Sequence, residues 1–559
     1  MHGSGGDDFV KRDELHPAGI ILVILPVLFF NLFLGSYSWF PRYEFYRIFI
    51  PLPEASLAAL FYLLIAGLRK RQLHSQGQRS IVLLLLSVFT LIFLALFAFT
   101  TAESFFQHIY QRSFDIKANV PLAASFFNMI FTTDLFSRPL FIMLPAALAG
   151  GALFILFLLL FRKGLLWVRA ISGPLHICFA LGLFILSLFL VSPPSPALIL
   201  ADQCIRPAGA VPEDIVLPRV EPPEVEEPAS AADQSYYSLP GLQDPHIHLF
   251  IVESYGMTIF TNPHHKKRLA EFFPEQYRLL REEGFYVFSS AYDSTTFGGT
   301  SWLADAALLT GIDIHTQALY DRVVKGGTRN LLHVLSDKGY RTVLSAPGTH
   351  FMTEEYMEFY SFDDYITFED FGYEGPYFCY GDMPDQYQLY HVFNTALGPE
   401  RDSGKPVFIE YILCSSHVPW NYIPPYIESW SGFEKGKVYQ DKTANTWYEN
   451  SWVAGSELFE GYTHSIRYSL ETVFGYAHRY LTGNDLLILV GDHQPKFPVS
   501  EKNAGFGVPI HIIARNRGIL LPLKRFGYKE GLIPPEIENL AGLEEFLGHF
   551  YSMAGFPSR

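Results

Sequence analysis

Five long apolar stretches fill the first 200 residues, and they constrain the fold more than any other feature. Four contain no Asp, Glu, Lys or Arg and the fifth contains only Glu54; they are 15–41, 48–68, 80–102, 139–161 and 170–201. At about 1.5 Å per residue, a helix of this length crosses the ~30 Å hydrocarbon core of a bilayer. Buried helices of soluble proteins are rarely so long and do not follow one another in this number. We therefore predict a multi-pass α-helical membrane domain of five helices over residues 1–193.

Lysine and arginine placement orients these predicted helices. Nine basic residues, from Lys11 and Arg12 to Arg169, fall on one side of the successive apolar runs, and five fall on the other. Connecting segments rich in Lys and Arg stay in the cytoplasm. We therefore expect a bacterial-type cytoplasmic (inner) membrane protein with a cytoplasmic N-terminus. Five crossings would place everything after residue 193 outside, in an extracytoplasmic (periplasmic) position.

Charge separates the two halves of the chain and excludes several functions. Residues 1–193 hold 14 Lys+Arg and 9 Asp+Glu, residues 194–559 hold 27 and 47, and the formal net charge is −15. Binding to nucleic-acid phosphates needs clustered basic residues, so we expect no nucleic-acid partner. A channel or transporter is disfavoured because the apolar runs hold almost no ionisable groups. The predicted helices are instead interpreted as an anchor.

Two further regions follow the predicted anchor. Residues 194–245 are rich in proline and acids, as in the run from Val220 to Pro228, and show neither helical nor strand periodicity, which is typical of an extended linker. Residues 246–559 are numerous enough to bury a core of their own. In this region apolar runs alternate with helical patterns, which indicates an extracytoplasmic α/β domain built as a three-layer sandwich.

The expected elements of this domain can be placed by number. The predicted strands are 248–253, 286–289, 342–346, 407–411, 486–490 and 509–513, and the predicted helices are 269–283, 301–310, 330–338 and 463–480. In such sheets, ligands bind at the carboxyl ends of the strands. The residues that follow each predicted strand are therefore the candidates for function.

Polar residues follow four of the predicted strands. Glu253 ends the first, Thr300 lies after the second at the start of a predicted helix, and His417 follows a later one. Asp492 and His493 come directly after the run Leu-Leu-Ile-Leu-Val-Gly. Each has an ordinary explanation: Glu253 could cap a turn, Thr300 is a good N-cap after two glycines, and Asp492-His493 could be a solvated pair. Their joint placement at one sheet edge favours function.

The segments Glu-Ser-Tyr-Gly at 253–256, Gly-Gly-Thr-Ser at 298–301 and Gly-Asp-His at 491–493 resemble the alkaline phosphatase/sulfatase superfamily. Five helices followed by one external domain are similar to its lipoteichoic acid synthase and phosphoglycerol transferase branch. The resemblance implies that Glu253, Thr300, Asp492 and His493 hold one divalent metal, Mn²⁺ foremost, with Zn²⁺ or Mg²⁺ as alternatives. Two carboxylates, an imidazole and an alkoxide also suit such ions chemically.

The same resemblance implies a reaction. Thr300 would attack a phosphodiester and form a phospho-threonine, and His417 would contact the substrate or assist the leaving group. The expected substrate contacts are His417, Trp420 and His350, the last in the segment 349–355. We thus expect a metal-dependent phosphoglycerol-type transferase that takes a headgroup from a membrane phospholipid donor and passes it to a cell-envelope glycan or lipid acceptor.

Departures from the family keep other functions open. The segment 349–355 lacks the arginine that the synthases place against glycerophosphate, which favours a phosphoethanolamine transferase or a phosphodiester hydrolase as alternatives. Thr300-Ser301-Trp302-Leu303-Ala304 lacks the sulfatase signature that matures to formylglycine, so sulfate-ester hydrolysis is disfavoured. A non-catalytic membrane protein that binds an envelope glycan or partner is the alternative of another class. Cys379 and Cys414 could form a disulfide or remain two buried thiols.

Overall fold

The chain divides into two compact units, Met1–Pro207 and Ala208–Arg559, and each is described by itself. The computed structural model describes residues 58–59, 61–62, 76–109, 152, 155–160 and 181 of the first unit. Of the second unit it describes 245–349, 354–378, 383–398, 405–418, 420, 422–440, 446–447, 456–483, 485–501 and 504–554. The linker predicted at 194–245, except for its last residue, lies outside the described residues, as do most of four of the five predicted apolar helices.

The first unit contains the long helix α4 (Gln76–Ile109), which includes the whole apolar run 80–102. Its Phe89 and Phe93 pack against aromatic rings from two other predicted runs, Tyr62 and Phe157, with centroid distances of 6.1 and 5.1 Å. Across the residues that the structure describes, no helix combines the length and the apolar character needed to cross a membrane.

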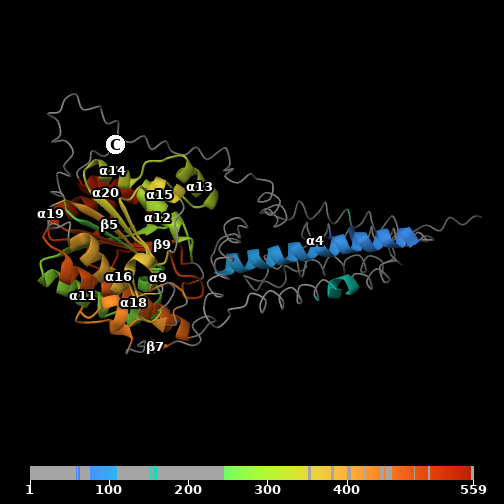
Figure 1. The fold of residues 1–559 in the computed structure, drawn as a ribbon, viewed down its shortest axis with the longest axis horizontal. Helices are drawn as coiled ribbons and strands as arrows, with labels where there is room; N and C mark the ends of the chain where they lie inside the picture. Colours follow the sequence, from blue (N-terminus) through green and yellow to red (C-terminus); the bar gives the residue numbers. More distant parts are fainter. Residues whose placement is uncertain are drawn as a thin grey trace, which may run out of the picture. The chain divides into compact units, whose positions relative to one another are not determined.

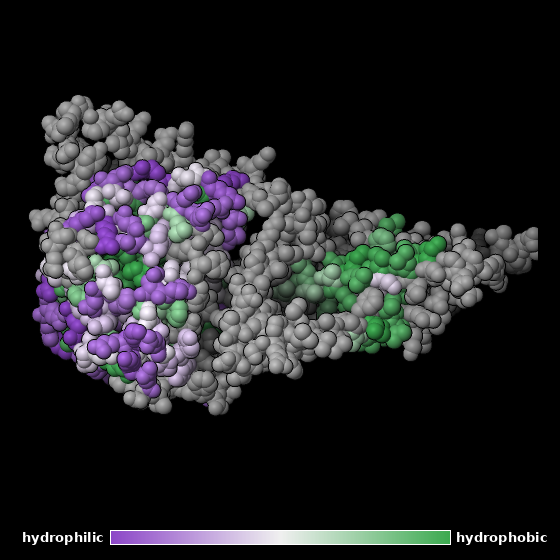
Figure 2. Space-filling model, in the orientation of Figure 1, coloured by the Kyte–Doolittle hydropathy of each residue, from purple (hydrophilic) through white to green (hydrophobic). Residues whose placement is uncertain are grey.

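One side of α4 exposes large aliphatic side chains. They recur every three or four residues, as on one helix face, and Figure 2 shows them as a continuous apolar surface: Ile81, Leu84, Leu85, Val88, Leu91 and Ile92. The described part of the second unit presents a mixed surface with many hydrophilic residues in the same view.

The second unit is built on one mixed β-sheet with the strand order β10-β2-β9-β8-β1-β5-β3-β4, and β11 pairs with β2. All six predicted strands are present in it, as β1 (Ile247–Val252), β2 (Tyr286–Asp293), β3 (Arg341–Ser345), β5 (Val407–Leu413), β8 (Leu486–Gly491) and β9 (Gly507–Ala514). Strand β9 runs antiparallel to both of its neighbours, β2 and β8. The carboxyl ends of β2, β8, β1, β5 and β3 therefore meet at one edge.

Helices cover both faces of this sheet, which confirms the α/β sandwich predicted for the second unit (Figure 1). One core cluster contains Ile247, Leu249 and Ile251 of β1; the other contains Phe250 and Val252, as the two-residue period of a strand requires. The first cluster lies under α12 (Ser301–Thr310), α13 (Gln317–Lys325), α14 (Leu331–Asp337), α15 (Glu354–Tyr360) and α20 (Phe546–Ala554). The second lies under α9 (Thr258–Thr261), α11 (Phe272–Glu282), α16 (Asp385–Val392) and α18 (Ser456–Tyr480).

Three sheet strands were not predicted, because they are too short to show an alternating pattern. These are β4 (Asp364–Ile366), β10 (Lys529–Glu530) and β11 (Ala541–Gly542). Strand β2 also extends four residues beyond the predicted range, through Ser290 and Tyr292. Polar residues at the centre of β2 interrupt the apolar pattern and so concealed this length. Ser289 is nevertheless fully buried, with its hydroxyl paired to His511 Nδ1 at 2.7 Å.

Candidate active site

Strand register places Glu253 beside Asp492. Strands β1 and β8 are parallel neighbours in which Val252 pairs with Gly491, so the next residue of each strand reaches the same edge of the sheet. Glycine is needed at position 491, because a Cβ there would lie 1.8 Å from the carbonyl oxygen of Tyr255. The close approach of the loop after β1 to the end of β8 therefore depends on this glycine.

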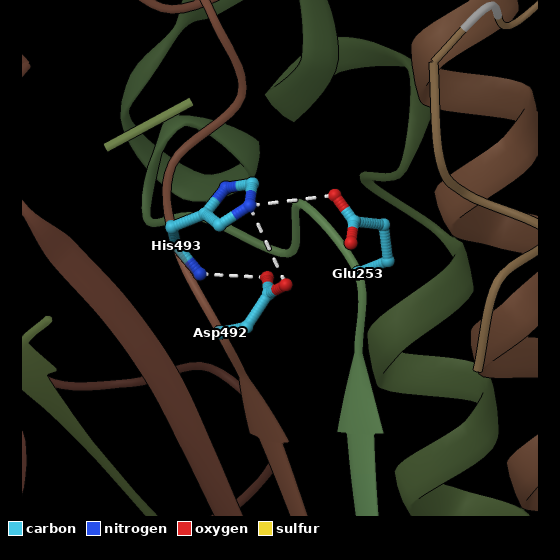
Figure 3. Close-up of side chains that lie close together, drawn as sticks. All are labelled: Glu253, Asp492 and His493. Atoms are coloured by element: carbon cyan, nitrogen blue, oxygen red, sulfur yellow. Dashed lines mark hydrogen bonds and ion pairs between the residues drawn. The ribbon is translucent and has the colours of Figure 1, made fainter. Parts of the chain in front are cut away.

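Three of the four predicted metal-binding residues converge at this edge, from the ends of β1 and β8 (Figure 3). His493 Nε2 lies 3.4 Å from Glu253 Oε1 and 3.5 Å from Asp492 Oδ2. One ligand atom from each of the three residues lies within 4.8 Å of the others. We call Glu253, Asp492 and His493 the acidic triad.

Backbone groups hold the acidic triad in place. Asp492 Oδ1 accepts the N–H of Ser254 at 2.7 Å and that of His493 at 2.6 Å. The Ser254 hydroxyl donates to Glu253 Oε1 at 2.8 Å. His493 Nδ1 lies 2.8 Å from the carbonyl oxygen of Gln494; since a carbonyl can only accept, Nδ1 is the donor in this bond, and Nε2 is the ring atom that faces the two carboxylates.

The two carboxyl groups of the acidic triad have opposite pKa shifts. Burial and the charge of Glu253 raise the pKa of Asp492 to about 7. Burial also raises the pKa of Glu253, but His417 and His493 outweigh it, so the net shift is downward. The two carboxyl groups thus compete for ionisation, as expected for neighbouring acids that are buried together.

A divalent cation fits this environment. The donors are two carboxylates and one imidazole lone pair, which suit Mn²⁺, Zn²⁺ or Mg²⁺ to different degrees. Among the described residues, neither carboxylate forms an ion pair with Lys or Arg; His493 lies near both, and His417 also interacts electrostatically with Glu253. Two buried acids without a permanent positive partner are costly. A bound cation would remove that cost, so the donor set is consistent with a metal centre.

Thr300 begins α12, as predicted, in a strained conformation. Its φ of 64° is left-handed, and Gly298 and Gly299 before it also have positive φ. The Thr300 hydroxyl donates to the carbonyl oxygen of Gly299 at 2.5 Å rather than capping the helix. Thr300 is therefore at the helix start beside the acidic triad, but its hydroxyl makes no contact with Glu253, Asp492 or His493 in this conformation.

Ser301 is the hydroxyl that reaches the acidic triad, and the sequence analysis missed it. Its Oγ lies 3.2 Å from Glu253 Oε2 and 3.3 Å from His493 Nε2. The available signal was its position next to Thr300 in Gly-Gly-Thr-Ser, since the first helical residue after an N-cap also lies at the helix start. Two adjacent hydroxyls, on Thr300 and Ser301, are thus candidates at this site.

His417 lies in the turn after β5 and interacts electrostatically with the acidic triad. Its Nδ1 bonds to the carbonyl oxygen of Val418 at 2.5 Å, and its backbone N–H donates to the Cys414 carbonyl at 3.0 Å. The pKa of His417 is lowered overall. Burial has the largest effect, His493 and Lys496 act in the same direction, and Glu253 and the bond to the Val418 carbonyl oppose them. Lys496 was also missed by the sequence analysis, although a lysine four residues beyond Asp492 was a usable signal. Burial lowers its pKa as well.

Of the two remaining predicted substrate contacts, the structure describes Trp420 but not His350. Trp420 is only 1% exposed; its indole N–H donates to the Ser416 carbonyl at 2.6 Å, and its ring packs against Tyr462 with centroids 5.1 Å apart. It therefore supports the turn that carries His417 from within the core. Its ring lies 6.0 Å from Lys496 Nζ. His350 and Cys379 lie outside the described residues, and Cys414 is buried.

Comparison with known proteins agrees with the superfamily resemblance. The sulfatase family model matches residues 250–519. A lipoteichoic acid synthase, LtaP from Listeria monocytogenes, is 12% identical over 58% of this chain and 74% of its own, with a TM-score of 0.38. An alkaline phosphatase superfamily protein from Vibrio parahaemolyticus is 15% identical over 56% and 67%, with a TM-score of 0.36. The phosphonate monoester hydrolase of Agrobacterium radiobacter is 12% identical over 56% and 74%, with a TM-score of 0.33.

No curated protein matches the sequence. The matched segment 250–519 spans β1 to α19 (Arg517–Leu520) and includes the acidic triad, both hydroxyls and His417. Residues 250–519 thus match the model of the sulfatase family. The members of this superfamily are metal-dependent enzymes, and the chain carries a group of residues able to bind a metal ion at the expected sheet edge.

Proposed function

We propose that this protein is a metal-dependent transferase that takes a phospho-alcohol headgroup, of the phosphoglycerol type, from a membrane phospholipid and passes it to a cell-envelope glycan or lipid. The observation that carries the proposal is the convergence of Glu253, Asp492 and His493 at the start of α12, where two hydroxyls lie. That combination provides a nucleophile and a charge-neutralising site together, which phosphodiester chemistry requires.

Glu253, Asp492 and His493 would hold the divalent ion, Mn²⁺ in our proposal, and Thr300 would be its fourth ligand. When bound, such an ion supplies positive charge that stabilises phosphate oxygens and lowers the pKa of a neighbouring hydroxyl. The start of α12 adds partial positive charge from backbone N–H groups at the same point. The acids and His493 thus position the charge, and α12 positions the nucleophile.

In the first step, the Thr300 hydroxyl loses its proton as its oxygen forms a bond to phosphorus, the bond from phosphorus to the lipid alcohol oxygen breaks, and the proton passes through His417 to that oxygen. His417 is suited to deliver this proton. Its Nδ1 is held by the Val418 carbonyl, which leaves Nε2 as the atom for proton transfer. In the second step, an acceptor hydroxyl attacks phosphorus, the bond from phosphorus to the Thr300 oxygen breaks, and the acceptor's proton passes through His417 back to that oxygen.

Membrane anchoring belongs to the same proposal. Its support is the five apolar runs of the sequence and the exposed aliphatic face of α4. We propose a multi-pass protein of the inner membrane with a cytoplasmic N-terminus and an extracytoplasmic catalytic domain. Because residues 194–559 carry excess acid, anionic headgroups would repel the domain at low salt, so the anchor rather than charge attraction would bring it to its lipid donor.

The test uses the full-length protein in detergent with Mn²⁺ and phosphatidylglycerol or phosphatidylethanolamine as donor. We expect diacylglycerol release from phosphatidylglycerol and, in acid-quenched protein, a phosphorylated peptide that contains residue 300. Thr300→Ala should lower the rate on the order of 10³-fold or more. Thr316→Ala, which removes the threonine cap of α13 away from the site, is the matched control and should retain activity.

The variants separate the two hydroxyls and the rival functions. If Ser301→Ala abolished the phosphopeptide while Thr300→Ala kept it, Ser301 would be the nucleophile instead. Faster turnover of phosphatidylethanolamine than of phosphatidylglycerol would indicate a phosphoethanolamine transferase. Release of free phospho-alcohol without labelling of an acceptor would indicate a hydrolase. Wild-type protein without Mn²⁺ binding or turnover of either lipid would refute the enzymatic proposal and favour a binding protein.

A further inference from the structure

Asp385 is a buried acid outside the acidic triad whose carboxylate serves a distant segment. It is the first residue of α16 and only 1% exposed. Its Oδ1 accepts the backbone N–H groups of Cys414 at 3.0 Å and Ser415 at 2.9 Å, and its Oδ2 accepts the Ser469 hydroxyl at 2.6 Å. Its own backbone N–H donates to Ser415 Oγ at 3.0 Å.

The bonds of the Asp385 carboxylate do not cap the start of α16. The N-cap of that helix is Pro384, and no side chain caps it. A buried carboxylate is tolerated only when hydrogen bonds replace its lost water, and here every donor comes from the turn after β5 or from α18. Among the described residues, Asp385 forms no ion pair with a basic side chain. Its three accepted bonds therefore all hold other segments against α16.

The turn held by Asp385 is the one that carries His417. On the opposite side of the same turn, Ser416 Oγ donates to the Glu253 carbonyl oxygen at 2.6 Å, and the Trp420 indole donates to the Ser416 carbonyl. The turn 414–417 is thus fixed between α16 and α18 on one side and the end of β1 on the other. Loss of the Asp385 carboxylate would release the bonds to the Cys414 and Ser415 N–H groups.

We propose that Asp385 is a positioning residue that sets the placement of His417 relative to the acidic triad; this inference rests on the proposed function. An acceptor oxygen is needed at this point, because two backbone N–H donors face it, whereas the Ser469 hydroxyl can either donate or accept. Asn keeps one oxygen for the two N–H groups and offers its amide N–H to Ser469 Oγ. Ala keeps neither, so the two substitutions should differ.

Kinetics on the full chain in detergent with Mn²⁺ provide the first test. Asp385→Ala should lower kcat/KM by about 10²-fold, mostly through kcat, because small misplacements of a catalytic group have effects of this size. Asp385→Asn should retain most of the activity. In a His417→Ala background, Asp385→Ala should add less than about threefold, since residues that act through one another are not additive. Additive penalties would overturn the proposal.

Hydrogen exchange provides a test that does not depend on turnover. Asp385→Ala should speed exchange in the peptide covering 412–418 and leave Mn²⁺ affinity unchanged. The matched control is Asp485→Ala, which removes another buried carboxylate that accepts a backbone N–H, from Thr482, at the opposite end of β8. That variant should lose stability without faster exchange at 412–418 or lower kcat/KM in the folded protein.

The two tests separate failure of the inference from failure of the proposed function. Wild-type protein that turned over no phosphodiester would refute the function, and the exchange data would still decide whether Asp385 holds the turn. Active wild-type protein with Asp385→Ala unchanged in both rate and exchange would refute the positioning role alone.

Discussion

A buried pair of acids, one on α12 and one on β5, makes the stability of the folded second unit fall as the pH rises toward neutral. Asp305 of α12 and Glu410 of β5 are 8% and 1% exposed, and neither forms an ion pair with a basic side chain among the described residues. Their surroundings are tyrosines, chiefly Tyr360 with Tyr320 and Tyr356. Burial raises the pKa of Asp305 from 3.8 to about 6, and burial together with Asp305 raises that of Glu410 well above its usual range.

The size and sign of the effect follow from Asp305. Because its folded-state pKa lies above its unfolded value, the folded protein binds more protons between these two pH values. Its contribution to stability is therefore complete below about pH 4 and is lost as pH rises through about 6. A shift of about two units corresponds to roughly 3 kcal/mol. For a unit of about 350 residues, with an unfolding entropy of roughly 0.7 kcal/mol/K, that is about 4 °C in Tm.

Thermal unfolding of wild type and Asp305→Asn from pH 4 to pH 8, followed by tryptophan fluorescence, measures the effect. Wild type should lose stability across this range, Asp305→Asn should lose several degrees less, and the variant should be the more stable of the two at pH 8. Asp313→Asn, at an exposed aspartate near the end of the same helix, should follow wild type. Parallel pH curves for wild type and Asp305→Asn would show that ionisation of Asp305 does not destabilise the folded protein.

Two further predictions concern the site and the backbone that shapes it. Adding Mn²⁺ at about 100 times its Kd should stabilise wild type by roughly 2.7 kcal/mol, and Glu253→Gln or Asp492→Asn should abolish that gain in a thermal-shift assay; an unchanged gain would place the metal elsewhere. Gly491→Ala should destabilise the second unit by several kcal/mol, because its methyl group would meet the Tyr255 carbonyl at 1.8 Å; a neutral result would contradict the close approach.

The sequence predicted the central architecture of the second unit because its strands are continuous apolar runs. In β8 and β1, helices cover both faces, so every residue is buried and the pattern is unmistakable. Edge strands such as β4 and β10 are short and pair on one side, so they lack such a pattern. What periodicity could not predict is strand order, since the pairing of β1 with both β5 and β8 joins segments more than 150 residues apart.

The sequence predicted those site residues whose type is unusual at the end of a buried strand. Glu253 and Asp492-His493 stand out because charged groups follow buried runs. Ser301 does not stand out, because serine at a helix start is ordinary whether or not its hydroxyl reaches a carboxylate. Asp385 is hidden for a different reason: its role depends on a turn about 30 residues away, which no local pattern reveals.

Helix α12 connects two pairs of acids that the fold neutralises in different ways. Ser301, in its first turn, faces Glu253 and His493; Asp305, four residues later and so on the same face, meets Glu410. At the sheet edge, an imidazole lone pair and hydroxyls accompany the carboxylates, and such donors can complete the coordination of a cation. Deeper in the core, only tyrosines accompany them, so a proton is the available source of neutrality. With a metal bound, the same helix would be held by a cation at its start and by a proton one turn further on, and raising the pH should weaken the second attachment while strengthening metal binding at the first.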